Sequence, residues 1–315
     1  MLKITKRVLQ YFGLFTLFIS SALAVSSEFN FSVTPIADNV YSIISPSYGR
    51  PSAENKGWNS NSHFVVTKSG VLVFDTGSSE IIGKGIIKAI KSVTEQPIRW
   101  VVNSHSHADH WLGNAAFSNI GAKILATASS TSAMKEDGQG VVDAFERMTE
   151  GATGNSSIAY PTTLLTKREK RMFGEVEVEF IFANDGHSPG DVLMWLPKQK
   201  IILGGDVVNS DWIPIMTPRG NVPHLIDTLN AIIKLDPAIV LTGHGKGTTV
   251  QSVIRDVNLL SSVWKLVENG NKEGKSVDNI LSQVTAELAG KYSPLYKDFD
   301  SSSSYLVQMM YKKQQ

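Results

Sequence analysis

Short apolar segments alternate with amphipathic segments along most of this chain, and that alternation limits the folds open to it. Apolar residues two apart predict half-buried strands, and apolar residues three and four apart predict helices. We expect strands at 39–45, 63–77 (a hairpin turned at Ser69-Gly70), 98–104, 122–129, 175–185 and 238–245, a hairpin of 191–197 with 200–206, and helices at 79–93 and 223–235. Strands that alternate with helices predict an α/β domain.

The C-terminal section has a different pattern, which predicts two or three helices. Their expected spans are 249–268, 276–290 and 301–313, with breaks that contain Gly, Asn and Lys. The sequence shows no repeat and no low-complexity linker before this section. We therefore expect one domain over 35–250 and a helical extension over 251–315 that packs on the same domain.

The first residues have the layout of a secretory signal peptide. Three basic residues in MLKITKR precede the apolar run VLQYFGLFTLFISS, and ALA at 22–24 has the small residues of a cleavage site. The alternative is an uncleaved membrane anchor, but the run is shorter than the ~20 residues of a spanning helix. We expect residues 1–24 to be removed and the protein to be periplasmic or secreted, with no stable membrane insertion after cleavage.

Composition limits the partners and the chemistry. The 315 residues carry a net charge of +1, which gives no electrostatic reason to expect nucleic acid as a partner. We expect a small-molecule substrate. The chain has no cysteine, so disulfides, thiolate ligands and a cysteine nucleophile are all excluded. Any metal site must be built from nitrogen and oxygen ligands.

The stretch VVNSHSHADHWLGN at 101–114 places three of the seven histidines in one turn after a strand. His105 and His107 can converge on one ion, and Asp109 and His110 then point towards a second position. His187 and His244 lie at other junctions between a strand and a loop, each beside glycine. A tetrahedral zinc site is complete with four ligands, so this many candidates predicts two neighbouring ions. The alternative, separate surface or hydrogen-bonded histidines, would require a coincidence of five such contexts.

These motifs resemble the metallo-β-lactamase superfamily over roughly residues 35–250. HSHADH is similar to the superfamily signature, VFDTG to the motif that precedes it, and GHG at 243–245 to the last ligand motif. The segment GHSPGDVLMWLPKQKIILGGD, residues 186–206, is most similar to zinc β-lactamases. The resemblance implies a four-layer αβ/βα sandwich with its site at one edge, between two sheets.

The resemblance also implies a set of metal ligands. The first metal would be held by His105, His107 and His187, and the second by Asp109, His110 and His244. Asp206 stands where the similar zinc β-lactamases usually have cysteine, and an aspartate there commonly bridges both metals in other hydrolases of the superfamily. Two zinc ions per chain are expected; iron and manganese remain open because the same nitrogen and oxygen ligands serve all three.

The activity implied is hydrolysis by a hydroxide that bridges the metals and attacks a carbonyl carbon, with Asp109 orienting the nucleophile. A β-lactam-like amide or an ester would be the substrate. An alternative is a lactonase, thioesterase or esterase, because Asp206 replaces cysteine. HWLGNAAF and the helical tail also resemble exported members associated with quinoproteins, so a hydrolase of that kind is a further alternative. A metal-binding protein without hydrolytic turnover is the alternative from another class.

Other residues are candidates for supporting roles. Gly220-Asn221 resembles the GN that places an asparagine near the developing oxyanion, so Asn221 is a catalytic and substrate-binding candidate. Trp58 lies in the long polar loop 45–62, which we expect to form a flap over the metals and to contact substrate. Asp75 is expected to support the histidine turn from outside the ligand set. Asn209 stands where a carboxylate-binding lysine is usual, which leaves Arg219 or Lys246 as possible anchors.

Overall fold

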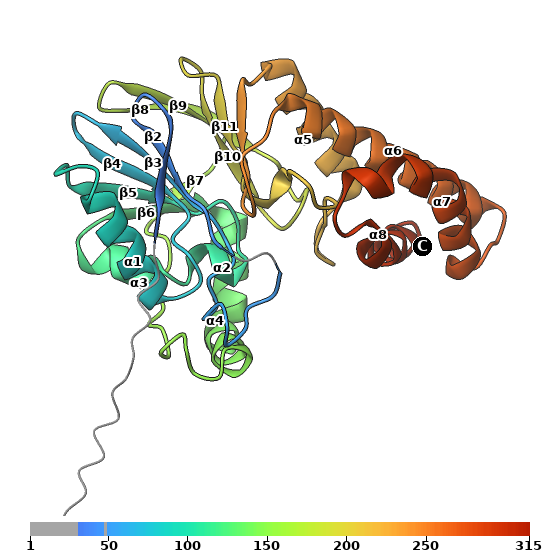
Figure 1. The fold of residues 1–315 in the computed structure, drawn as a ribbon, viewed down its shortest axis with the longest axis horizontal. Coiled ribbons are helices and arrows are strands. Elements are labelled where there is room, and N and C mark those ends of the chain that lie inside the picture. Colours follow the sequence, from blue (N-terminus) through green and yellow to red (C-terminus); the bar gives the residue numbers. More distant parts are fainter. Residues whose placement is uncertain (1–30, 47–48) are drawn as a thin grey trace, which may run out of the picture. The chain divides into compact units, whose positions relative to one another are not determined.

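Two β-sheets lie face to face at the centre of the protein, in a computed structural model that describes residues 31–46 and 49–315 (Figure 1). The predicted signal peptide lies outside the described residues. Sheet A has the strand order β1-β2-β3-β4-β5-β6-β7. Its strands are β1 Val33–Ala37, β2 Val40–Ile43, β3 Ser62–Thr67, β4 Gly70–Phe74, β5 Ile98–Val102, β6 Lys123–Thr127 and β7 Thr163–Leu165.

Sheet B has the strand order β12-β11-β10-β9-β8. Its strands are β8 Glu169–Phe173, β9 Val176–Phe182, β10 Val192–Leu196, β11 Ile201–Leu203 and β12 Ile239–Leu241. Strands β4 to β7 pair in parallel, as do β11 and β12, whereas the remaining neighbours are antiparallel. Parallel strands direct their carboxyl ends to one edge, where α/β folds place their sites.

Helices complete the four layers. Buried side chains such as Phe74 of β4 and Phe180 of β9 fill the space between the sheets. Helices α1 (Glu80–Lys91) and α3 (Asn114–Asn119) lie beside sheet A, and α5 (Val222–Leu235) and α6 (Val250–Lys272) cover the outer face of sheet B (Figure 1). The expected four-layer sandwich is therefore confirmed.

The C-terminal helices pack into the outer core of sheet B. Helices α7 (Val277–Tyr292) and α8 (Phe299–Lys313) follow α6, with a short 3-10 helix η2 (Ser293–Leu295) between them. Leu306 of α8 and Ile280 of α7 belong to the same buried cluster as Leu193 of β10 and Leu229 of α5. No helix in the described part of the chain is both long and apolar enough to span a bilayer.

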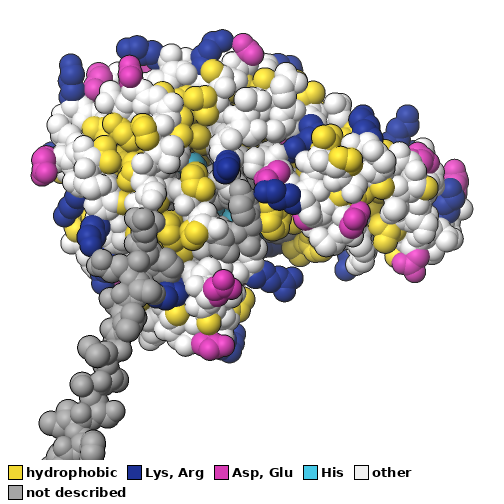
Figure 2. Space-filling view, in the orientation of Figure 1, with side chains coloured by type: hydrophobic (Ala, Val, Ile, Leu, Met, Phe, Trp, Pro, Cys, Tyr) yellow, Lys and Arg dark blue, Asp and Glu magenta, His cyan; other side chains and the backbone are white. Residues whose placement is uncertain are grey.

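The structure differs from the sequence expectations at the sheet edges. The expected strands did not include residues 33–37 or 169–173, which form β1 and β8. Strand β8 begins with three consecutive charged residues, Glu169 to Arg171, and charges suit an edge strand because they discourage pairing with another chain. Residues 130–160 were assigned no element from sequence, and the first part of this segment lies in helix α4 (Ala128–Met148), which is kinked at Gly138. Charged side chains of both signs are scattered over the face shown in Figure 2 rather than gathered in one patch.

Candidate metal centre

The histidine turn begins where β5 ends. Residues 103–107 are loop, and the short helix α2 (Ala108–Trp111) follows, with His107 at its N-cap position. Trp111 is fully buried and its indole N–H donates to Ser106 O at 2.9 Å, so it holds the turn in place as a packing residue. This geometry brings His105, His107, Asp109 and His110 towards ligands that follow strands of sheet B.

The remaining candidates come from strand ends of sheet B. His187 lies in the loop between β9 and β10, where the Asp191 carboxylate accepts hydrogen bonds from the amides of His187 and Ser188. Asp206 lies in the 3-10 helix η1 (Gly205–Val207), directly after β11. His244 follows β12, and a Cβ at the preceding Gly243 would lie 2.0 Å from Asp206 Oδ1, so only glycine fits there.

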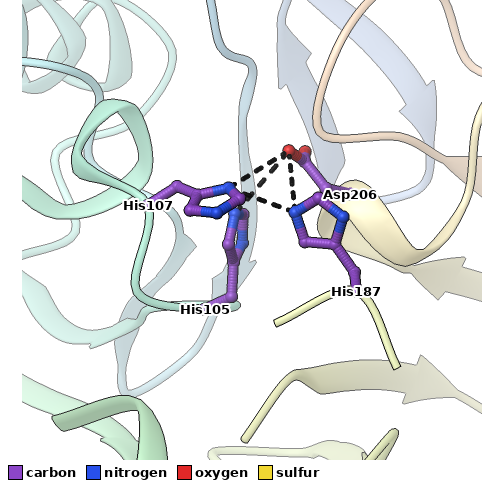
Figure 3. A group of neighbouring side chains, drawn as sticks. All are labelled: His105, His107, His187 and Asp206. Carbon is purple, nitrogen blue, oxygen red and sulfur yellow. Dashed lines mark hydrogen bonds and ion pairs between the residues drawn. The ribbon is translucent and has the colours of Figure 1, made fainter. Parts of the chain in front are cut away.

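Four of these side chains converge on one point (Figure 3). Ligand atoms of His105, His107, His187 and Asp206 all lie within 4.8 Å of one another. His187 Nε2 is 3.1 Å from His107 Nδ1, and Asp206 Oδ2 is 3.6 Å from the Nε2 atoms of His105 and His187. Ligands that hold zinc at ~2.0–2.1 Å in a tetrahedron are about 3.3 Å apart, so this group fits a metal ion.

A second group lies beside the first. Asp109, His110 and His244 place one ligand atom each within the same limit of 4.8 Å. His110 Nε2 is 3.4 Å from His244 Nε2 and 3.6 Å from Asp109 Oδ2. Asp206 reaches this group too, because its Oδ1 is 3.3 Å from His110 Nε2 and its Oδ2 is 3.3 Å from His244 Nε2. One carboxylate therefore touches both groups.

The outward ring nitrogens of four histidines are already engaged. Nδ1 of His105 lies 2.7 Å from Ser104 Oγ, and Nδ1 of His110 lies 2.9 Å from Asp75 Oδ2. Nδ1 of His187 lies 2.6 Å from Ile215 O, and Nδ1 of His244 lies 2.6 Å from Asn59 O. Such contacts set the tautomer and orientation of a metal-binding imidazole. The inward Nε2 of His105 is buried and makes no hydrogen bond. A cation would satisfy that atom.

The charges of the first group suit a cation. Burial lowers the pKa of His105 well below its usual value, and burial together with the neighbouring His187 lowers the pKa of His107 to about 3. Burial alone would raise the pKa of Asp206, but the facing His244 and His110 hold it well below its usual value. Neutral imidazoles and an ionised carboxylate are the forms that bind metals.

The second group attracts positive charge. Burial opposes protonation of His244, but the Asp206 and Asp109 carboxylates outweigh it and raise its pKa to about 9. The same balance raises the pKa of His110 well above its usual value. A bound metal would replace these protons, so metal affinity at this group should increase with pH.

A comparison of sequences decides the family. The sequence model of the metallo-beta-lactamase superfamily matches residues 55–244, more than half of the chain. The chain belongs to this superfamily.

Individual relatives match over shorter stretches. The metallo-beta-lactamase IND-1 of Chryseobacterium indologenes is 31% identical over 158 residues, which are 50% of this chain and 57% of that protein. The metallo-beta-lactamase type 2 of Bacillus cereus is 24% identical over 151 residues, which are 48% of this chain and 52% of that protein. The chain thus spans about half the length of these curated relatives.

Solved structures share the fold. A metallo-beta-lactamase from Pontibacter korlensis has a TM-score of 0.58 at 21% identity, with 74% of this chain and 99% of that chain covered. The sec-alkylsulfatase Pisa1 from Pseudomonas sp. has a TM-score of 0.72 at 16% identity, with 89% of this chain and 50% of that chain covered. At these identities the likeness concerns the fold alone.

Within this superfamily member, Asp75 supports the ligands as the sequence predicted. It directly follows β4 and accepts hydrogen bonds from the Ser104 amide at 2.7 Å and from Ser104 Oγ at 2.8 Å. Its Oδ2 also faces His110 Nδ1. The carboxylate therefore orients one ligand directly and the start of the histidine turn through its backbone.

The sequence analysis missed three neighbouring residues of the loop before β3. Asn59 Nδ2 donates to Asp109 Oδ2 at 3.0 Å, and Ser60 Oγ donates to Asp109 O. Asn61 Nδ2 donates to Thr242 O at 2.9 Å and to Gly245 O at 2.7 Å. The loop thus supports two of the three ligands of the second group, Asp109 and His244. The polar run NSNS was the available signal, but sequence alone cannot show what a loop touches.

Two predicted substrate contacts lie elsewhere. Trp58 is 2% exposed, donates its indole N–H to Ser60 O and packs on Phe31 with ring centroids 4.3 Å apart. Asn221 is the N-cap of α5, and its side chain accepts the His224 amide at 3.1 Å. Neither residue lines the pocket at the ligands, and the contacts of both side chains are those of supporting residues.

The pocket over the ligands has a volume of about 280 Å³. Its lining includes the apolar residues Trp212, Ile213 and Ile215, together with Arg50. Of the two anchors considered from sequence, neither lines it, and Arg219 instead pairs with Glu136 of α4 at 2.9 Å. Among the described residues that line this pocket, Arg50 is thus the one arginine or lysine.

Proposed function

We propose that this protein is a dinuclear zinc hydrolase that cleaves a carbonyl substrate, either a β-lactam-like amide or an ester. The observation that carries the proposal is the position of Asp206, whose carboxylate lies within 3.6 Å of ring nitrogens in both ligand groups. Membership of the superfamily supports the same reaction class. The nitrogen and oxygen ligands favour zinc, although iron and manganese use similar sets.

Different side chains of the chain would bind the metal ions, position the attacking water and bind the substrate. Zinc at such a site lowers the pKa of water and polarises a carbonyl group. The five histidines and two aspartates would hold the ions. Asp109, oriented by Asn59 Nδ2, would position the attacking water and take up its proton. Trp212 and the two isoleucines of the pocket would bind the apolar part of the substrate, and Arg50 an anionic part.

The residues near Asp206 bear on the choice of substrate. Asp206 and Asn209 stand where the similar zinc β-lactamases have cysteine and lysine, so two features expected of those enzymes are missing. A lactone, a thioester or an aryl ester is therefore the second candidate. A pocket of about 280 Å³ supports a small substrate in either case.

One panel of assays tests the proposal. Purified protein of known zinc content would be given a chromogenic cephalosporin, a carbapenem, a homoserine lactone, a thioester, an aryl ester and a secondary alkyl sulfate. Turnover of β-lactams alone would select the amide, and preference for the lactone or esters the second candidate. Turnover of the alkyl sulfate alone would overturn carbonyl hydrolysis. If the zinc-bound protein turns over none of these substrates, the result would favour a metal-binding protein without hydrolytic turnover. Asp206→Ala is the inactive control.

We also propose that the protein is exported, on the basis of the first 24 residues. Periplasmic or secreted protein isolated after expression from the full gene should begin directly after Ala24. Intact protein that begins at Met1 and stays with the membrane would contradict this proposal.

A further inference from the structure

One wall of the pocket is a loop without regular secondary structure, residues 208–217, which we call the wall loop. It starts two residues after Asp206 and supplies Trp212, Ile213 and Ile215 to the pocket. Its backbone also holds a candidate metal ligand, because Ile215 O accepts a hydrogen bond from His187 Nδ1 at 2.6 Å and the Thr217 amide donates to His187 O at 2.8 Å.

The C-terminal helices hold this wall loop in place. Asp298, just before α8, accepts the Ile213 amide through Oδ1 at 2.8 Å. The Lys297 amide donates to Asp211 O at 2.8 Å, and their side chains form an ion pair. Tyr305 of α8 donates its hydroxyl to Met216 O at 3.2 Å. These contacts fall within six consecutive residues of the wall loop.

Buried apolar side chains reinforce the same junction. Ile213 and Met216 of the wall loop belong to the buried cluster that contains Phe299 and Leu306 of α8. Asp298 itself is only 8% exposed. A buried amide that loses its acceptor costs more than a solvated one, so Ile213 N depends on Asp298 for its position.

We infer that Asp298 is a positioning residue that sets the orientation of His187 and the shape of the pocket through the wall loop. The inference rests on the proposed metal centre. The superfamily match ends at residue 244, so α6, α7 and α8 lie outside it. The helical extension then supports the candidate metal centre as well as the hydrophobic core. Substitution of a residue that holds a metal ligand in place typically lowers metal affinity by about 10–100-fold.

The test compares matched variants of the full chain. Asp298→Ala removes the acceptor of the Ile213 amide, whereas Asp298→Asn keeps a carbonyl oxygen there. Ser276→Ala removes the N-cap of α7, which accepts the Asn279 amide, and destabilises the extension without touching the wall loop. The readouts are the Zn²⁺ dissociation constant, measured by competition with a chromogenic chelator, the Tm, and kcat and KM on the best substrate.

Asp298→Ala should weaken the binding of one zinc ion by about tenfold and raise KM, and Asp298→Asn should restore most of both. Ser276→Ala should lower Tm but leave zinc binding and KM unchanged. Should Asp298→Ala fail to fold, Tyr305→Phe, which removes only the hydroxyl to Met216 O, should shift zinc affinity in the same direction by a smaller factor.

Three results would overturn the inference, and they are distinguishable. If the parent protein binds no zinc, both the metal centre and this inference fail. If the parent binds zinc but Asp298→Ala and Tyr305→Phe bind it as tightly and keep the parent KM, the inference alone fails. A loss of zinc affinity in Ser276→Ala equal to that in Asp298→Ala would also overturn it, since general destabilisation would then account for the effect.

Discussion

At the scale of single residues, the site depends as much on the side chains behind the ligands as on the ligands. Spacing and residue type singled out the histidine turn, His187 and His244, and the resemblance to the superfamily implied the full ligand set with Asp206. The structure brings the seven candidate ligands together in two adjacent groups. The partners of Nδ1 in His187 and His244 were not predictable, because Ile215 O and Asn59 O are backbone atoms of distant loops. Every residue type has a backbone carbonyl oxygen, so such contacts cannot be predicted from residue identity.

Asn59 provides a first test at this scale. Replacement of Asn59 by Ala removes the hydrogen bond to Asp109 Oδ2, so kcat/KM and zinc affinity should fall by about 10–100-fold. The measurements are steady-state kinetics and chelator competition. Glu54→Ala, an exposed position in the same loop, should match the parent. An Asn59→Ala protein with parental values in both assays would show that Asp109 needs no such support.

His63 provides a test of pH dependence. It is buried between Ser42 Oγ and Thr242 O, and burial lowers its pKa from 6.5 to about 4. Because the unfolded state protonates first, the free energy of unfolding should fall as the pH drops from 6.5 to 4, by about 1.4 kcal/mol per pH unit from this residue. Urea unfolding of metal-free protein should show this slope reduced in His63→Gln. Identical slopes would mean that His63 is not held neutral.

At the scale of elements, the long periodic segments were predictable and the edges were not. Helices α1 and α5 and strands β3 to β6 form close to their expected spans, since a strong apolar pattern decides both their type and their burial. Strands β1, β7 and β8 are short edge strands whose pairing depends on neighbours in space. Asn221 belongs here as well, because GN resembled a catalytic motif and the structure uses its asparagine as a helix cap.

Asn221→Ala separates these two roles. Loss of the cap to the His224 amide should lower the free energy of unfolding by about 1 kcal/mol, with kcat unchanged. Asn221→Ser, which can still cap α5, should recover most of the stability. Denaturant unfolding and kinetics on the same preparations measure both quantities. A large loss of kcat at parental stability would instead support a catalytic role for Asn221.

At the scale of the whole molecule, the site joins the two halves of the sandwich. His105, His107, Asp109 and His110 follow a strand of sheet A, and the other three ligands follow strands of sheet B. Metal ions held by both halves should stabilise the folded state, because unfolding separates the ligands.

Metal removal tests this coupling. A site filled at a zinc concentration of about 1,000 times its Kd contributes roughly 4 kcal/mol, so chelation should lower Tm by on the order of 10 °C. Calorimetry with and without a chelator measures the shift, and added zinc should reverse it. An unchanged Tm would mean that the ions, if bound, do not link the two halves.

The most direct measurement is the zinc content of the purified protein after dialysis, beside that of Asp206→Ala. Two ligand groups that share one carboxylate predict two zinc ions per chain in the parent and a loss of at least one in the variant. A parent that retains no zinc, or a variant that retains as much as the parent, would contradict the account.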